Sequence, residues 1–363
     1  MKIKAPREMV LSGIQKVQNI ITSKAALPVL SNILIETQQD TLRFTATDLD
    51  IGITCVIPVH VVEQGAITVP AKRFSDIIKE LPSDEIEIST KKNNQVFIET
   101  EKCQFKIMGL AREEFPRLPE LQNKQAIKIE QALLKQMLAV TSFAASFDET
   151  RYVLNGILFK ISKNTLTLVA TDGKRLAIIE KKIEKESDAE VSIIVPIKTI
   201  HELNRTLTDD GELSLVLGTN QVLFDVGQVI IISRLIEGEF PDYRQVIPAP
   251  SENKIVLNRE QFLLAIRRAA LLSTPDYQAV KFEVFKNKLV VSKSTPDVGE
   301  SREEMGVEYH GKEIVIGFNP HYLIDVLKSI AHESIALEVT DSEKPGVMRI
   351  DGYVYIVLPM RLG

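Results

Sequence analysis

The sequence predicts an α+β protein made of three tandem repeats, each with two helices and a set of short antiparallel strands. Three observations support this prediction: motifs that recur about 125 residues apart, two amphipathic helical patterns in every copy, and strand-like segments between them. A repeat constrains the architecture of a chain more strongly than local propensity does, so the repeat decides the fold class.

Three short motifs occur twice in the chain, in the same order and at nearly the same spacing. The pairs are Ala46-Thr47-Asp48 with Ala170-Thr171-Asp172, Val69-Pro70 with Val195-Pro196, and Phe115-Pro116 with Phe240-Pro241. Three concordant spacings rarely arise by chance, so the second copy is a diverged duplicate of the first.

Two helical patterns recur in each copy, with apolar residues three or four positions apart, as on one face of an α-helix. The first pattern is expected over residues 7–24, 130–146 and 258–272, and the second over residues 70–82, 196–207 and 319–331. The second pattern follows Val-Pro in the first two copies and Phe318-Asn319 in the third. Its recurrence extends the repeat to a third copy.

The remainder of each copy consists of short strand-like segments separated by polar turn residues. Examples are residues 41–45, 165–169 and 222–226. Polar or proline-bearing stretches near residues 121–124 and 248–251 are typical of domain boundaries. The predicted domains are residues 1–123, 124–249 and 250–363.

Composition favours a globular cytoplasmic protein. Apolar residues make up 44% of the chain and charged residues 26%, and no segment approaches the roughly 18 apolar residues of a membrane span. The amino terminus lacks the apolar core of a signal peptide. Cys55 and Cys103 are far apart in sequence and are expected to be reduced thiols rather than a disulfide. No membrane partner is expected.

Motifs for nucleotide hydrolysis or zinc chemistry are missing, since the chain has no phosphate-binding glycine loop, no H-E-x-x-H and no paired C-x-x-C. Asp148, Glu149 and Asp172 are the alternative, as a carboxylate site for acid–base or metal chemistry. Asp48 and Asp172 occupy equivalent repeat positions, however, and this favours a role as turn or cap residues. We therefore expect no catalytic residue, no metal, no cofactor and no enzymatic activity.

Positive charge is concentrated in the predicted helices, although the whole chain has a formal net charge of −5. Such a distribution indicates a surface that binds phosphates of double-stranded DNA without reading its sequence. The alternative is an ordinary solvated helix face. The candidate residues are Lys24, Lys72, Arg73, Lys198, Arg205, Arg267 and Arg268.

Five short stretches spread along the whole chain carry a resemblance to a known family. They are residues 27–30 (LPVL), 151–156 (RYVLNG), 170–176 (ATDGKRL), 238–244 (GEFPDYR) and 358–362 (LPMRL). In this order and spacing, they make the chain similar to the β sliding clamps of bacterial DNA polymerase III.

The resemblance implies three clamp domains in a chain that pairs head to tail with a second copy into a ring. The helices of such a ring line a central hole, so the ring encloses duplex DNA and confers processivity on the replicative DNA polymerase. It also implies that Tyr152 faces DNA. Implied partners are replicative and other DNA polymerases, the clamp loader and repair proteins with clamp-binding motifs.

The resemblance further implies an apolar pocket for short peptide motifs between the second and third domains. The residues implied by position are Arg151, Leu154, Thr171, Gly173, Lys174, Arg175, Leu176, Pro241, Gln245, Val246, Asn319, Tyr322, Ile356, Leu358 and Met360. Some members of the family carry other residues at Lys174 and Gln245, and Gly363 extends the usual end. These departures bear on which partners the pocket prefers.

The implied dimer interface joins the first domain of one chain to the third domain of its partner. It would bury Phe105 and Ile107 against Leu271 and Leu272, and it would also close the open sheet edges. The main alternative to an enclosing ring is a repeated scaffold that recruits proteins without encircling DNA. The basic helix surfaces argue against that alternative.

Overall fold

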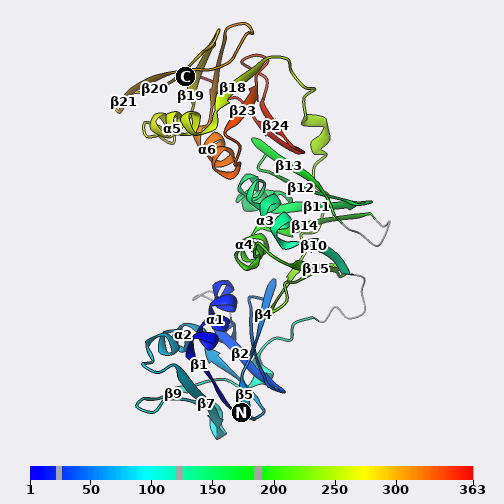
Figure 1. Cartoon of the computed structure of the whole chain (residues 1–363), viewed down its shortest axis with the longest axis vertical. Coiled ribbons are helices and arrows are strands. Elements are labelled where there is room, and N and C mark those ends of the chain that lie inside the picture. Colours follow the sequence, from blue (N-terminus) through cyan, green and yellow to red (C-terminus); the bar gives the residue numbers. More distant parts are fainter. Residues whose placement is uncertain (22–26, 120–125, 184–189, 363) are drawn as a thin grey trace. The chain divides into compact units, whose positions relative to one another are not determined.

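The computed structural model describes residues 1–21, 27–119, 126–183 and 190–362 (Figure 1). The chain divides into two compact units, the first formed by residues 1–133 and 198–235 and the second by residues 134–197 and 236–363. Each unit contains one eight-stranded antiparallel sheet and one smaller antiparallel sheet. Lys24, Gly363 and the boundary predicted at residue 123 lie outside the described residues, and the domain boundaries stay predictions.

The first unit has an eight-stranded sheet in the order β10-β15-β16-β17-β4-β3-β2-β6 and a five-stranded sheet in the order β5-β1-β7-β8-β9. Their bounds are β1 (Lys2–Pro6), β2 (Asn32–Gln38), β3 (Thr41–Thr47), β4 (Ile51–Pro58), β5 (His60–Glu63), β6 (Ala66–Pro70), β7 (Glu85–Lys91), β8 (Gln95–Glu99), β9 (Gln104–Met108), β10 (Ala126–Glu130), β15 (Glu212–Leu217), β16 (Gln221–Asp225) and β17 (Val229–Arg234).

The second unit has an eight-stranded sheet in the order β14-β11-β12-β13-β25-β24-β23-β18 and a four-stranded sheet in the order β21-β20-β19-β22. Their bounds are β11 (Gly156–Ser162), β12 (Thr165–Thr171), β13 (Arg175–Lys182), β14 (Val191–Pro196), β18 (Lys254–Asn258), β19 (Val280–Phe285), β20 (Lys288–Thr295), β21 (Gly299–Gly306), β22 (Ile314–Phe318), β23 (Ser334–Glu338), β24 (Gly346–Ile350) and β25 (Tyr353–Val357).

Each eight-stranded sheet joins strands from two successive repeats. In the first unit the joint is the pairing of β4 with β17, where Gly52 lies opposite Ile232. In the second unit the joint is the pairing of β13 with β25, where Leu176 lies opposite Ile356. Both strand orders correspond one to one, so the second sheet repeats the first in order and in register. We call these pairings the first joint and the second joint.

The helices of the described residues follow the two predicted patterns in each repeat. They are α1 (Arg7–Val17), α2 (Ala71–Glu80), α3 (Gln131–Ala139), α4 (Ile197–Thr206), α5 (Arg259–Ala270) and α6 (Pro320–Ser329). Several are shorter than the sequence predicts. After α3 the hydroxyl of Thr141 donates to the carbonyl of Met137 at 2.8 Å, and the chain continues in a short 3-10 turn. A side chain that hydrogen-bonds to the backbone in this way competes with the helix.

The apolar faces of the helices are buried and their basic residues remain outside. On α1, Val10, Ile14 and Val17 are completely buried, and the helix packs on β3 and β4. Gly13 permits this approach, because a Cβ at that position would lie 2.6 Å from the ring of Phe44. Cys55 on β4 is buried as well, and both cysteines are free thiols, as predicted. Within the described residues no helix is long and apolar enough to span a membrane.

Candidate functional site

The second Ala-Thr-Asp motif forms the turn between β12 and β13. One carboxylate oxygen of Asp172 accepts hydrogen bonds from the backbone N–H groups of Lys174, at 2.9 Å, and Arg175, at 3.0 Å. The hydroxyl of Thr171 donates to the carbonyl of Arg175 at 2.6 Å and accepts from the N–H of Gly173 at 3.0 Å. Gly173 has a φ of +85°, which favours glycine.

The first copy of the motif forms the same turn between β3 and β4. Asp48 accepts from the N–H groups of Asp50 and Ile51, and the hydroxyl of Thr47 donates to the carbonyl of Ile51. The position of Gly173 is taken by Leu49, which has a φ of +83°. Asp48 and Asp172 are therefore turn residues, as their equivalent positions in the repeat predicted.

The alternative carboxylate site gains no support from Asp148, which begins a short 3-10 turn. Its carboxylate accepts from the backbone N–H of Thr150 at 3.0 Å and from its hydroxyl at 2.7 Å. Both hydrogen bonds lower the pKa of Asp148, and the bond from the Thr150 hydroxyl has the larger effect. Among the described residues no group of three or more His, Cys, Asp or Glu side chains is placed to hold a metal ion.

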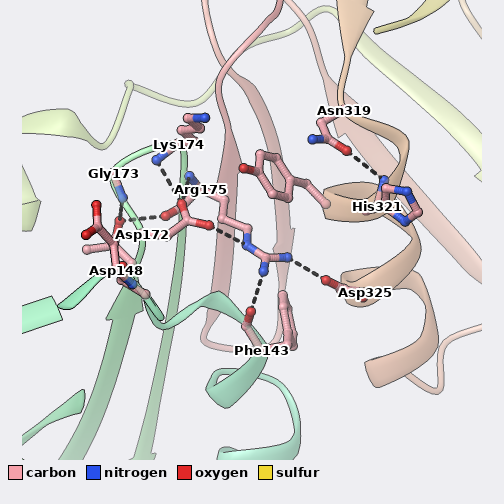
Figure 2. Close-up of polar contacts among 12 residues, drawn as sticks. Phe143, Asp148, Asp172, Gly173, Lys174, Arg175, Asn319, His321 and Asp325 are labelled. Carbon is pink, nitrogen blue, oxygen red and sulfur yellow. Dashed lines mark hydrogen bonds and ion pairs between the residues drawn. The ribbon is translucent and has the colours of Figure 1, made fainter. Parts of the chain in front are cut away.

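Arg175, the first residue of β13, connects the second repeat with α6 (Figure 2). Its Nε lies 3.0 Å from Oδ2 of Asp172, and its Nη1 lies 2.6 Å from Oδ2 of Asp325 on α6. Its Nη2 donates to the carbonyl of Phe143, and its guanidinium carbon lies 4.5 Å from the centre of the Tyr322 ring. All of these partners are in the second unit.

This arrangement keeps Arg175 charged although the residue is only 9% exposed. Burial by itself lowers the pKa of Arg175, but the hydrogen bond to Asp325 and the neighbouring negative charges raise it above its ordinary value. A buried guanidinium with these partners is a fixed connection between β13 and α6 rather than a freely available cation.

The next residue, Leu176, lies on the opposite face of the sheet, because successive side chains of a strand alternate between faces. On that face Leu176, Ile178 and Ile356 are part of one buried apolar cluster. The segment that links the second repeat to the third packs against this cluster through Phe240 and Tyr243. Leu176 and Ile356, two residues of the predicted pocket, are thus brought together.

Other predicted pocket residues lie in the segments that border this face. Pro241, Gln245 and Val246 are exposed in the linking segment, and Val246 keeps 57% of its surface accessible. The N–H of Leu358 donates to the carbonyl of Lys174 at 2.9 Å, and the N–H of Met360 donates to the carbonyl of Gly317 at 2.8 Å. The first bond holds the carboxyl-terminal segment against the turn after β12, and the second holds it against β22.

The remaining predicted pocket residues do not all lie on the face of Leu176. Tyr322 contacts Arg175 and therefore lies on the face opposite Leu176. Asn319 is buried and caps α6 by accepting from the N–H of His321 at 3.0 Å (Figure 2). Leu154 is 7% exposed, whereas Arg151 is exposed and donates to the carbonyl of Asp172.

A groove of about 450 Å³ opens further along the face that carries Leu176. Ile178, Tyr243 and Val354 contribute to its wall, and Arg349 and Asp351 are charged residues of its lining. The sequence prediction missed these residues. The alternation of side chains along a strand could have identified two of them, because residues two positions apart lie on the same face. Ile178 lies two positions after Leu176, and Val354 lies two positions before Ile356.

The six basic residues proposed for DNA that lie within the described residues are all exposed, and three of them are engaged with carboxylates. Lys72 and Arg73 on α2 and Arg267 on α5 have exposed side chains. Lys198 contacts Asp48, Arg205 lies 2.7 Å from Glu202, and Arg268 forms two hydrogen bonds with Glu303. Tyr152, which the resemblance places towards DNA, is 56% exposed.

The residues proposed for the dimer interface lie at the edge of one sheet and at the end of one helix. Phe105 and Ile107 are on β9, the edge strand of the five-stranded sheet. Phe105 is 39% exposed, but Ile107 is only 6% exposed, so little of its surface is left for an interface. Leu271 and Leu272 follow α5, and Leu271 is 81% exposed.

Comparisons with known proteins match the chain along almost its whole length. Family models described as the N-terminal, central and C-terminal domains of the DNA polymerase III beta subunit match residues 1–119, 128–242 and 244–361. A beta sliding clamp of Chlamydia pneumoniae is 35% identical over 100% of this chain and 99% of that protein.

Solved structures agree with these matches. The DNA polymerase III subunit beta of Pseudomonas aeruginosa is 34% identical with a TM-score of 0.94. A DNA polymerase sliding clamp of Bacillus subtilis is 31% identical with a TM-score of 0.96. Each match covers 100% of both chains.

Proposed function

The chain belongs to the β-subunit family of DNA polymerase III, the β sliding clamps, and on this premise we propose that it acts as a DNA sliding clamp. Two copies would close head to tail into a ring around duplex DNA and tether the replicative DNA polymerase. The observation that carries the proposal is the match of the whole fold, with its two eight-stranded sheets, to clamp structures. The proposal involves no catalytic step and places the protein in the cytoplasm.

Exposed cations on the helices support a weak contact with DNA. Lys72, Arg73 and Arg267 would approach phosphates without reading bases, while the engaged cations Lys198, Arg205 and Arg268 would contribute less. Binding of this kind is non-specific and sensitive to salt. A ring needs no stronger contact, because enclosure prevents dissociation while weak contacts allow sliding.

Recruitment of partners is proposed for the sheet face of Leu176 and Ile356. An aliphatic floor bordered by the exposed Val246 and Leu358 suits a short peptide with apolar anchors. Polar groups at Gly173 and Lys174 would orient the peptide backbone. Peptide motifs of polymerases, the clamp loader and repair proteins are the proposed ligands.

Dimer formation is proposed at the free edge of β9, which carries the half-exposed Phe105, and at Leu271 after α5 of the partner. An open edge strand exposes unpaired backbone groups, and pairing with another chain satisfies them. A large exposed leucine such as Leu271 would lose its water contact in the same step.

The test is retention on circular and on linearised DNA at moderate salt, after loading by a clamp loader with ATP. A ring stays on circles and slides off free ends, so we expect retention on the circular form only. A Leu271→Asp variant, which should not close the ring, is the matched control and should be lost from both forms. Equal retention of the parent protein on both forms would contradict enclosure and support the non-encircling scaffold.

A further inference from the structure

The two joints present equivalent side chains on equivalent faces. Gly52 and Ile232 of the first joint correspond to Leu176 and Ile356 of the second, and every aligned pair of the two registers differs by 124 positions. By the same alignment Thr54 corresponds to Ile178. The sheet face on which the peptide pocket is proposed in the second unit therefore has a counterpart in the first unit.

That counterpart is also a groove. Its volume is about 800 Å³, within the range of about 300 to 1,000 Å³ that is common for ligand sites. Leu34, Leu223, Ile230 and Ile232 provide its aliphatic surface, and the linking segment 115–119 forms one side. In the groove of the second unit, Ile178 and Val354 take the positions of Thr54 and Ile230, and Tyr243 of the linking segment also lines the groove.

One exchange distinguishes the floors of the two grooves. Gly52 has no side chain, and a Cβ at this position would lie 2.5 Å from Cδ2 of Leu118. Leu118 of the linking segment therefore lies directly over the strand, where the second unit has the side chain of Leu176. The floor remains apolar, but part of it belongs to the linking segment.

The rims differ in charge. Arg43, Arg112 and Arg117 border the first groove, together with Glu36 and Glu113. Arg112 lies 2.6 Å from Glu36 and offsets its charge.

The other two arginines of this rim have no acidic partner within the described residues. Arg43 donates only to the neutral amide of Gln38, and Arg117 is exposed. At the position that corresponds to Arg117, two residues after Phe240, the second unit has Asp242. The first groove is therefore the more basic of the two.

From this geometry we propose that the groove of the first joint is a second docking site, for a short extended peptide that carries aliphatic side chains flanked by aspartate or glutamate. The aliphatic side chains would lie on Ile230 and Ile232, and the carboxylates would pair with Arg43 and Arg117. The proposal rests on the peptide-binding function proposed for the corresponding face of the second unit. The two grooves would differ in selectivity, because within the described residues the first rim has two arginines without an acidic partner, Arg43 and Arg117, whereas the second has one, Arg244.

The experiment uses the full chain labelled at isoleucine δ1 methyl groups and two probe peptides. The acidic probe is acetyl-Asp-Leu-Asp-Leu-amide and the neutral probe is acetyl-Asn-Leu-Asn-Leu-amide. Methyl signals of Ile230 and Ile232 report on the first groove, and those of Ile178 and Ile356 report on the second unit. We expect the acidic probe to shift the signals of the first groove at about fivefold lower concentration than the neutral probe.

Charge reversal supplies the matched control. Arg43→Glu with Arg117→Glu should abolish the preference for the acidic probe at Ile230 and Ile232 and leave the shifts of Ile178 and Ile356 unchanged. Lys92→Glu with Lys102→Glu changes the net charge equally, at exposed positions outside the groove, and should preserve the preference.

The possible outcomes separate this inference from the proposed function. Shifts confined to Ile178 and Ile356 would overturn the second site and leave the proposed pocket intact. Shifts confined to Ile230 and Ile232 would support the second site and count against the pocket. A response at neither pair, or equal affinity of both probes at the first groove, would overturn the inference.

Discussion

Nη1 of Arg175 lies 2.6 Å from Oδ2 of Asp325, although the two residues are 150 positions apart in the chain. The contact connects the start of β13 to α6, and it leaves the opposite face of β13 free for Leu176. It therefore links the integrity of the second joint to the surface on which peptide binding is proposed.

Asp325→Ala should lower the free energy of unfolding of the second unit. Arg175 would remain buried with one carboxylate fewer, which we expect to cost about 1 to 2 kcal/mol, because Asp325 is itself partly exposed and solvent weakens the pair. Urea unfolding measures the change. Lys328→Ala on the exposed side of α6 is the control, and an equal effect of both variants would show that the pair does not stabilise the joint.

The turn before β13 offers a comparison between two copies of one motif. Gly173 and Leu49 have φ values of +85° and +83° in equivalent turns. Gly173→Ala should destabilise the protein by about 1 kcal/mol, because a side chain is strained in this conformation. Leu49→Ala replaces one strained side chain by another and should cost less. The two thermal unfolding curves decide the point, and a larger effect at Leu49 would contradict this reasoning.

The sequence predicted features that depend on residues near one another. The Ala-Thr-Asp motifs were predicted to be turns because Asp48 and Asp172 occupy equivalent repeat positions, and the hydrogen bonds of the second turn join residues only two to four positions apart. The amphipathic patterns located all six helices of the described residues, although their ends were placed too far along the chain. A helix ends where other hydrogen bonds compete with those of the helix, such as the bond from the Thr141 hydroxyl to the Met137 carbonyl. The spacing of apolar residues does not reveal such bonds.

Features that depend on distant residues were not predicted. Nothing near Arg175 indicates that Asp325 is its partner, and nothing near Ile107 shows that its own sheet already buries it. The strand pairings that join successive repeats could not be predicted for the same reason, because Gly52 and Ile232 meet only when strands of two repeats pair. The pocket residues came from resemblance, and the structure adds that Arg175 and Tyr322 lie on the face opposite Leu176 and Ile356.

Leu176→Ala combined with truncation after Leu358 should abolish binding of an apolar polymerase-tail peptide. The substitution removes part of the floor, and the truncation removes Met360, whose N–H anchors the terminal segment to Gly317. Fluorescence anisotropy of a labelled peptide measures the affinity, and sedimentation measures the dimer, which should persist. Unchanged peptide affinity would refute the assignment of the pocket.

Cys55 provides a prediction on pH. Burial raises the pKa of its thiol above the ordinary value of 9.0, against the opposing charge of Lys16. The folded protein therefore keeps this proton at a pH at which the unfolded chain releases it. The contribution of Cys55 to stability is present below pH 9.0 and is lost as pH rises through the folded pKa.

The expected result is that the difference in unfolding free energy between the parent and Cys55→Ala shrinks from about pH 8 to about pH 10. The cavity left by the substitution contributes equally at every pH and cancels in this comparison. Urea unfolding under reducing conditions measures the difference. A constant difference across this range would mean that Cys55 titrates alike in the folded and unfolded states.

The ion pair between Arg268 and Glu303 reduces the positive charge that α5 can present to DNA. Arg268 donates two hydrogen bonds to the Glu303 carboxylate, and this hydrogen bonding lowers the pKa of the Glu303 carboxyl and so keeps it ionised. Glu303→Gln would remove that negative charge and leave Arg268 available for phosphate. We expect tighter binding to linear duplex DNA at low salt, by a factor of about 2 to 5, with a steeper loss of affinity as salt increases.

The matched control for this last prediction is Glu313→Gln, which removes one negative charge at an exposed position of the same repeat. If both variants bind DNA equally more tightly, net charge explains the gain and Arg268 has no special place on the DNA surface. If only Glu303→Gln does, then the ion pair normally limits the affinity of α5 for phosphate. Such a limit would suit a ring that must slide, because each cation withheld from DNA lowers the friction of the contact while enclosure keeps the protein in place.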